Sequence, residues 1–223
     1  MIKKNVLLGL TTTSNSNWRE KINEINKYNI KDIALFLTGI EHEERKELYS
    51  LLEDTGIKSI YHVHARGDMS EKEMQYLVDT YDVRAFNIHS IRSKYPSQNF
   101  PIKFQNITYI ENTLTVPDVE EIKIYAGLCI DFSHWEAHKF LHWKEYSKLT
   151  HLANTYNIGC CHVSAVNYYV GIFPYDSHLA KDKKGFNYLK KYIKYLPQNI
   201  SLELENSFEE QLQYKKYIEK IIS

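Results

Sequence analysis

Eight short apolar runs, separated by stretches with helical periodicity, are the feature that most limits how this chain can fold. Each run has the length and composition of a buried strand. The runs span residues 6–10, 33–38, 59–64, 85–89, 107–112, 128–131, 159–163 and 201–206. The predicted helices span residues 18–28, 41–54, 71–81, 143–156, 186–196 and 208–222. Because strands that alternate with helices pair in parallel, eight such units predict an α/β fold, a single (β/α)8 TIM barrel domain.

Local signals at the ends of helices support this alternation. Ser70 and Glu73 have the spacing of a capping box before the third predicted helix. Gly56 and Gly159 fall where a helix gives way to a strand, a position typical of left-handed C-caps. The segment 90–106 contains two prolines and lacks a clear helical face, so we expect an irregular crossover there.

The composition excludes several classes of protein. Lys and Arg balance Asp and Glu at 28 each, so the chain lacks the basic footprint of a nucleic-acid-binding protein. No apolar stretch is long enough to cross a bilayer, and the run 6–10 is too short for a signal peptide. Cys129, Cys160 and Cys161 are too few for a disulfide framework, which predicts reduced thiols in a cytoplasmic protein. The adjacent Cys160 and Cys161 should face opposite sides of their strand.

Six of the predicted strands end in side chains of metal-binding types, although strands that serve only packing should be apolar throughout. The ends read HVH at 62–64, NIH at 87–89, IEN at 110–112, DFSH at 131–134, CH at 161–162 and ELE at 203–205, and DSH follows at 176–178. The carboxyl ends of barrel strands meet at one mouth. Imidazole and carboxylate together suit Zn, Mn or Fe, and the lack of ligating Cys favours a catalytic site over a structural one.

Each of these residues also has an ordinary interpretation. A single histidine at a strand end, such as His89, is more often a hydrogen-bonded rim residue than a ligand. Three buried carboxylates, those of Glu111, Asp131 and Glu205, would be costly without a cation. A bound ion would remove that cost, and so, less completely, would Arg66 or Lys181. The coincidence of ligand types at six strand ends favours a metal site.

The residues resemble the xylose isomerase-like TIM barrel superfamily, and within it the endonuclease IV (AP endonuclease family 2) branch. The resemblance extends over nearly the whole chain, so residues 1–223 are predicted to form one such domain. Nine positions match the set by which that branch holds three zinc ions: His64, His89, Glu111, Asp131, His134, His162, Asp176, His178 and Glu205. Two choices remain open. His62 shares a face with the preferred His64, and Glu203 shares one with Glu205.

The resemblance implies phosphoester hydrolysis at up to three Zn2+. Glu111 would bridge two ions, and Glu205 would position the attacking water, which makes these two glutamates the predicted catalytic residues. Clustered cations lower the pKa of water and neutralise phosphate oxygens. The substrate implied is abasic-site DNA. The short loops and zero net charge also leave a smaller phosphorylated sugar or nucleotide open.

Two alternatives belong to other classes of function. A sugar isomerase or epimerase would use a single Mn2+ or Mg2+, with two glutamates as its acid/base pair. Its ligands would be Glu111, Asp131, His162 and Glu205, and the remaining histidines and Asp176 would be unnecessary. A non-catalytic barrel could instead keep metal for stability or bind a small ligand.

Overall fold

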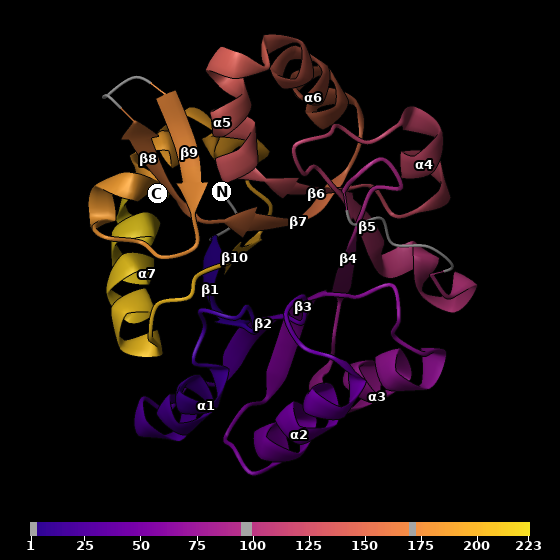
Figure 1. Ribbon diagram of the computed structural model, residues 1–223, viewed down its shortest axis with the longest axis vertical. Helices are drawn as coiled ribbons and strands as arrows, with labels where there is room; N and C mark the ends of the chain where they lie inside the picture. Colours follow the sequence, from indigo (N-terminus) through magenta and orange to yellow (C-terminus); the bar gives the residue numbers. More distant parts are fainter. Residues whose placement is uncertain (1–3, 95–99, 170–172) are drawn as a thin grey trace.

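Eight parallel strands close into a barrel, and helices lie around its outside (Figure 1). The computed structural model describes residues 4–94, 100–169 and 173–223. The strand order is β1-β10-β7-β6-β5-β4-β3-β2, and β1 pairs with both β2 and β10 to complete the ring. The strands are β1 Asn5–Thr11, β2 Asp32–Phe36, β3 Ser59–His64, β4 Ala85–His89, β5 Thr108–Glu111, β6 Leu128–Asp131, β7 Ile158–Val163 and β10 Asn199–Leu202. The predicted (β/α)8 fold is confirmed.

The helices agree with the sequence pattern in most places. They are α1 Trp18–Lys27, α2 His42–Glu53, α3 Glu71–Tyr81, α4 Val119–Ile124, α5 Phe132–Leu141, α6 Trp143–Thr155 and α7 Phe208–Ile222. Neither α4 nor α5 was predicted. The face that α5 buries mixes the apolar Phe132 and Trp135 with the polar Ser133, Glu136 and His138, so its apolar stripe is interrupted. No helix in the described part of the chain is long and apolar enough to cross a membrane.

Three segments form 3-10 helices instead of α-helices. They are η1 Ile102–Ile107, η2 Lys183–Lys191 and η3 Ile193–Tyr195. The predicted α-helix at 186–196 is therefore wrong. Its buried side chains, Phe186, Leu189 and Tyr192, recur at every third residue, which is the period of a 3-10 helix. The irregular crossover expected at 90–106 contains η1, and its residues 95–99 lie outside the described residues.

A hairpin outside the barrel follows β7. Its strands, β8 Ala165–Tyr169 and β9 Phe173–Ser177, are antiparallel and pair Val166 with Asp176. The hairpin packs against α5 (Figure 1). The sequence pattern indicated only a loop there. The hairpin matters because it carries Asp176 to the end of the barrel where the strands finish.

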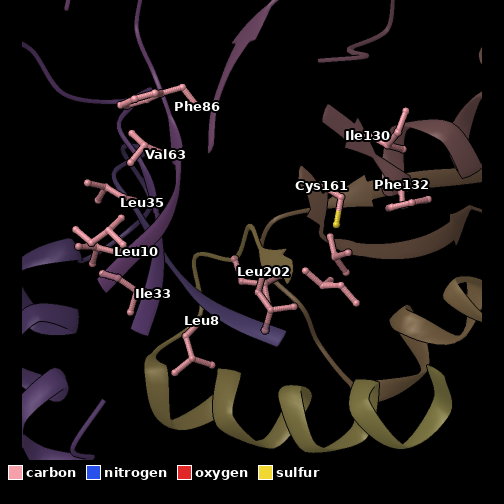
Figure 2. Close-up of a cluster of buried hydrophobic side chains, with 14 of the residues drawn as sticks. Leu8, Leu10, Ile33, Leu35, Val63, Phe86, Ile130, Phe132, Cys161 and Leu202 are labelled. Carbon is pink, nitrogen blue, oxygen red and sulfur yellow. The ribbon is translucent and has the colours of Figure 1, made fainter. Parts of the chain in front are cut away.

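The main hydrophobic core lies between the strands and the surrounding helices. Figure 2 shows part of this layer, with Leu8, Leu35, Val63 and Cys161 among the labelled side chains. Cys160, the neighbour of Cys161 on β7, instead packs with Ala85 and Cys129 in a separate buried cluster. The prediction that the two adjacent cysteines face opposite sides is confirmed, and all three cysteines are buried and free.

The predicted left-handed caps at Gly56 and Gly159 are wrong, because neither residue has a positive φ. The left-handed residue that ends α3 is Asp82, with φ 54°. Gly159 is required for a different reason. A Cβ at this position would lie 2.0 Å from Cζ of Tyr109, so only glycine leaves room for the tyrosine ring.

The predicted capping box of α3 forms only in part. The Ser70 hydroxyl accepts a hydrogen bond from the backbone N–H of Glu73 at 3.2 Å. The Glu73 carboxylate, however, pairs with Arg45 on α2 instead of returning to the cap. A complete capping box opens α7, where Ser207 and Glu210 bond to one another's backbone N–H groups.

Candidate metal centre

The carboxyl ends of the barrel strands bring imidazoles and carboxylates to one mouth. β3, β4, β5 and β6 end on a predicted ligand, β7 carries one next to its last residue, and a glutamate follows β10 directly. These residues are His64, His89, Glu111, Asp131, His162 and Glu203. His134 on α5, Asp176 on β9 and His178 just after β9 complete the set, which we call the mouth cluster. Hydrogen bonding along the sheet fixes where each strand ends, and thereby which side chain reaches the mouth.

Glu111 lies at the centre of the mouth cluster and is 3% exposed. Its Oε2 is 2.9 Å from Nε2 of His64 and 3.8 Å from Nε2 of His89. Its other oxygen, Oε1, is 3.6 Å from Nδ1 of His162. The two oxygens of one carboxylate thus face two different groups of donors, as in a carboxylate that bridges two ions.

A second group of donors consists of Asp131, His162 and Glu203. One ligand atom from each lies within 4.8 Å of the other two, and Nδ1 of His162 is 3.2 Å from Oε2 of Glu203. Oδ2 of Asp131 and Nδ1 of His162 are buried and lack a hydrogen-bond partner among the described residues. Buried polar atoms without partners are costly. A cation between these atoms would satisfy both, so the residues present fit a metal ion.

A third, more exposed group forms where the hairpin meets α5. Nε2 of His134 is 3.6 Å from Oδ2 of Asp176, and Nε2 of His178 is 3.8 Å from the same oxygen. Nδ1 of His134 is 3.5 Å from Oδ2 of Asp131, which joins this group to the second one. The three groups therefore form one continuous cluster.

Asn87 on β4 orients the buried part of the cluster. Its Nδ2 donates to Oε2 of Glu111 at 2.6 Å, so its Oδ1 is the atom that faces Nε2 of His62 at 2.8 Å and Nε2 of His162 at 3.2 Å. An amide oxygen only accepts, so both rings carry their proton on Nε2. The Nδ1 lone pair of His162 then points at Glu111 and Glu203. This arrangement is repulsive for a neutral ring, and either a proton on Nδ1 or a metal ion between these groups would remove the repulsion.

The mouth cluster attracts cations strongly. Burial opposes ionisation of Glu111, yet His162 and His64 hold its pKa well below the usual value. Burial likewise disfavours a charged His162, but Glu111 and Glu203 raise its pKa well above the usual value. Asp131 and Asp176 outweigh burial at His134 and raise its pKa to about 10. In the described chain, the carboxylates of the mouth cluster form ion pairs with histidines alone. The site therefore contains no fixed cation of its own.

The preference for Glu205 over Glu203 is corrected by the structure. β10 ends at Leu202, earlier than the predicted run 201–206, and the N–H of Glu203 still bonds to Val163 of β7 at 3.0 Å. Glu203 thus keeps its place in the barrel. Glu205 lies beyond it, and its carboxylate accepts a hydrogen bond from the Thr13 hydroxyl at 2.6 Å.

The structure also places the remaining candidates. His64 lies in the mouth cluster, whereas His62 lies deeper and bonds through Nδ1 to the Ser201 hydroxyl at 2.8 Å. Arg66 pairs with Asp68 at 2.9 Å, away from the mouth carboxylates. Lys181 is exposed beyond the hairpin. Asn87 was not predicted as a site residue. It lies two residues before His89 on β4, so the two side chains point to the same face of the strand, and this spacing could have identified it.

Neither a family model nor a curated protein matches the sequence. Among solved structures, the chain is similar to a xylose isomerase domain protein from Alicyclobacillus acidocaldarius subsp. acidocaldarius. The match covers 98% of each chain at a TM-score of 0.51 and 12% identity. The shared fold is a (β/α)8 TIM barrel. At this identity the similarity extends to the fold alone, and the activity must be argued from the mouth cluster.

Proposed function

We propose that this chain is a divalent-metal-dependent enzyme, similar to endonuclease IV, that hydrolyses a phosphoester at a multinuclear zinc centre. The observation that carries the proposal is the position of Glu111. Its two oxygens face separate donor groups, with His64 and His89 on one side and His162 on the other. A site for a single ion does not need a carboxylate shared in this way.

The number of donors supports the same conclusion. Catalytic zinc usually takes three protein ligands and keeps a position open. The mouth cluster offers three donors to each of three ions, with Glu111 shared. The groups are His64, His89 and Glu111; Asp131, His162 and Glu203; and His134, Asp176 and His178. A sugar isomerase with one ion would leave His64, His89 and the whole third group without a role.

Bound divalent ions supply Lewis acidity, which polarises a phosphoryl oxygen and makes water nucleophilic near neutral pH. The chain's own residues supply position and proton transfer. Asn87 fixes the ring of His162 and the carboxylate of Glu111. Glu203, buried beside His162, is placed to accept the proton that attacking water loses. Glu203 therefore takes the catalytic role that was predicted for Glu205.

The substrate we favour is a small phosphorylated sugar or a nucleotide, with abasic-site DNA as the second choice. The formal net charge is zero, so long-range attraction to a phosphate backbone is weak. A substrate with a single phosphate does not depend on long-range attraction, because metal ions bound in the mouth cluster would attract it at short range.

The test combines a metal count with an activity screen. Zinc-loaded protein should hold about three ions per chain in its mouth cluster and hydrolyse either small phosphoesters or abasic-site DNA. Glu111→Gln should lower the rate about a thousandfold. Glu205→Gln is the matched control and should leave the rate nearly unchanged, because Glu205 bonds to Thr13 outside the cluster. Failure of fully zinc-loaded protein to hydrolyse any of these substrates would reject the proposal.

A sugar isomerase or epimerase is the second candidate, because the donors it needs for one ion, Asp131, His162 and Glu203, lie together beside Glu111. In this case Glu111 and Glu203 would be the acid/base pair beside one Mn2+ or Mg2+. Binding of about one ion per chain, together with exchange of solvent deuterium into a ketose, would support this candidate over the hydrolase.

A further inference from the structure

A second group of metal-ligating side chains lies inside the barrel, one layer below the mouth cluster. It consists of His62 on β3, Cys129 on β6 and Cys160 on β7. Each residue precedes a mouth ligand by two positions, so each occupies the next inward-facing place on its strand. All three are at most 1% exposed. We call this group the core triad.

The donor atoms of the core triad are close enough to share an ion. One ligand atom from each residue lies within 4.8 Å of the other two, and Cys129 and Cys160 are direct partners across the β6–β7 pairing. Donors bound to one tetrahedral ion at about 2.0–2.3 Å lie roughly 3.3–3.8 Å apart. Small side-chain rotations therefore suffice to close the site.

The imidazole of His62 is already oriented for this role. Its Nε2–H donates to Oδ1 of Asn87, so Nδ1 carries the lone pair, which now accepts from the Ser201 hydroxyl at 2.8 Å. An ion on Nδ1 would take the place of that hydroxyl. The hydrogen bond to Asn87 would remain and hold the ring, as the outer partners of metal-bound histidines do.

The surroundings of the core triad differ from an ordinary barrel interior. Such interiors are filled mainly by large branched apolar side chains. Here the two cysteines pack with Ala85, and the rings of Tyr61 and Tyr109 lie against them. Both tyrosines are partly exposed.

We propose that Cys129, Cys160 and His62 form a separate binding site for a thiophilic divalent ion of the zinc and cadmium class. Thiolates and imidazole prefer such ions, whereas the mouth cluster contains no thiol. Binding would convert both thiols to thiolates and release their two protons to solvent. This site is independent of the reaction proposed for the mouth.

Titration of the reduced full-length chain with Cd2+ tests the proposal. Thiolate-to-cadmium charge transfer absorbs in the ultraviolet, and nitrogen and oxygen ligands give no such band. The final amplitude of the band should correspond to about one thiolate-bound Cd2+ per chain, because Cd2+ bound in the mouth cluster adds nothing to it. It should be lost in Cys129→Ala and in Cys160→Ala. The matched control is Cys161→Ala, which should keep the band because Cys161 faces the helix layer (Figure 2).

The cadmium titration tests the core triad independently of whether the protein hydrolyses phosphoesters. A His64→Ala variant, altered only in the mouth cluster, should keep the full cadmium band whether or not the wild-type protein hydrolyses phosphoesters. Thermal melting should first show that each variant is folded. Absence of the band in folded, reduced wild-type protein, or its persistence in Cys129→Ala and Cys160→Ala, would overturn the proposal.

Discussion

Two buried clusters of charge in this chain balance that charge in different ways. Between α2 and α3, the fully buried Arg45 pairs with the largely buried Glu73 at 2.6 Å and with the exposed Asp68 at 3.2 Å. We call this the Arg45 cluster. In the mouth cluster, carboxylates such as Glu111 and Asp131 form ion pairs with histidines alone in the described chain. The Arg45 cluster contains a permanent cation, whereas the mouth depends on protons or metal ions.

The two clusters also differ in how fully their polar atoms are satisfied. In the Arg45 cluster, the Tyr49 hydroxyl donates to Glu73 at 2.9 Å, and Arg45 also donates to the Ile40 carbonyl. In the mouth, Asp131 and His162 each keep a buried atom without a hydrogen-bond partner among the described residues. Buried polar atoms that all have hydrogen-bond partners indicate a structural role. Buried polar atoms that lack partners, where several metal-binding side chains converge, indicate a site for a ligand.

The largest effect is expected from removing the permanent cation. Arg45→Met should lower the free energy of unfolding by about 3–5 kcal/mol, because Glu73 remains buried without its partner. Urea denaturation in the presence of a chelator measures this cost without a contribution from metal. Arg19→Met is the control, since the solvent-exposed Arg19–Glu47 pair should contribute far less to stability. Equal costs in the two variants would contradict a structural role for the Arg45 cluster.

Lys21 shows a third way to accommodate a buried charge, and its effect should be smaller. Its ammonium donates to the Thr11 hydroxyl at 3.0 Å and the Leu204 carbonyl at 2.6 Å, and burial lowers its pKa to about 7. Above pH 7 the unfolded chain binds more protons at this residue than the folded chain, so stability should rise with pH. The gain is about 2 kcal/mol between pH 7 and pH 9.

Urea denaturation across this pH range measures the gain from Lys21. The Lys21→Met variant lacks the titrating group, so its stability should change by about 2 kcal/mol less than that of the wild type over the same range. Parallel pH profiles for the two proteins would show that Lys21 remains charged when folded.

The strands and most mouth ligands could be predicted because their signals are local. Apolar runs mark the strands, and His64, His89 and Glu111 stand at the last position of theirs. The choice between Glu203 and Glu205 could not be made in this way, because side chains two residues apart point to the same face of a strand. It depends on where β10 ends, and the pairing of Glu203 with Val163 determines that.

Other parts of the site depend on contacts between distant segments. The role of Asn87 requires His62, Glu111 and His162 to surround its amide, and no local pattern reports such a contact. Asp176 was identified by its resemblance to a ligand motif, but the hairpin that carries it was not. The hairpin strands were missed because their periodicity is interrupted by exposed tyrosines.

The smallest effect expected is the coupling between the two clusters. The Arg45 cluster and the mouth share no hydrogen-bond partner in the described chain, so their contributions to stability should add. Zinc at about a thousand times its dissociation constant should stabilise the wild type by about 4 kcal/mol for each ion bound. The same increment, within about 0.5 kcal/mol, is expected for Arg45→Met at matched zinc saturation. Urea denaturation of the wild type and of Arg45→Met, each with zinc and with chelator, gives the four free energies of unfolding from which the coupling is calculated. A coupling above about 1 kcal/mol would mean that Arg45 acts on the mouth as well as on its own helices.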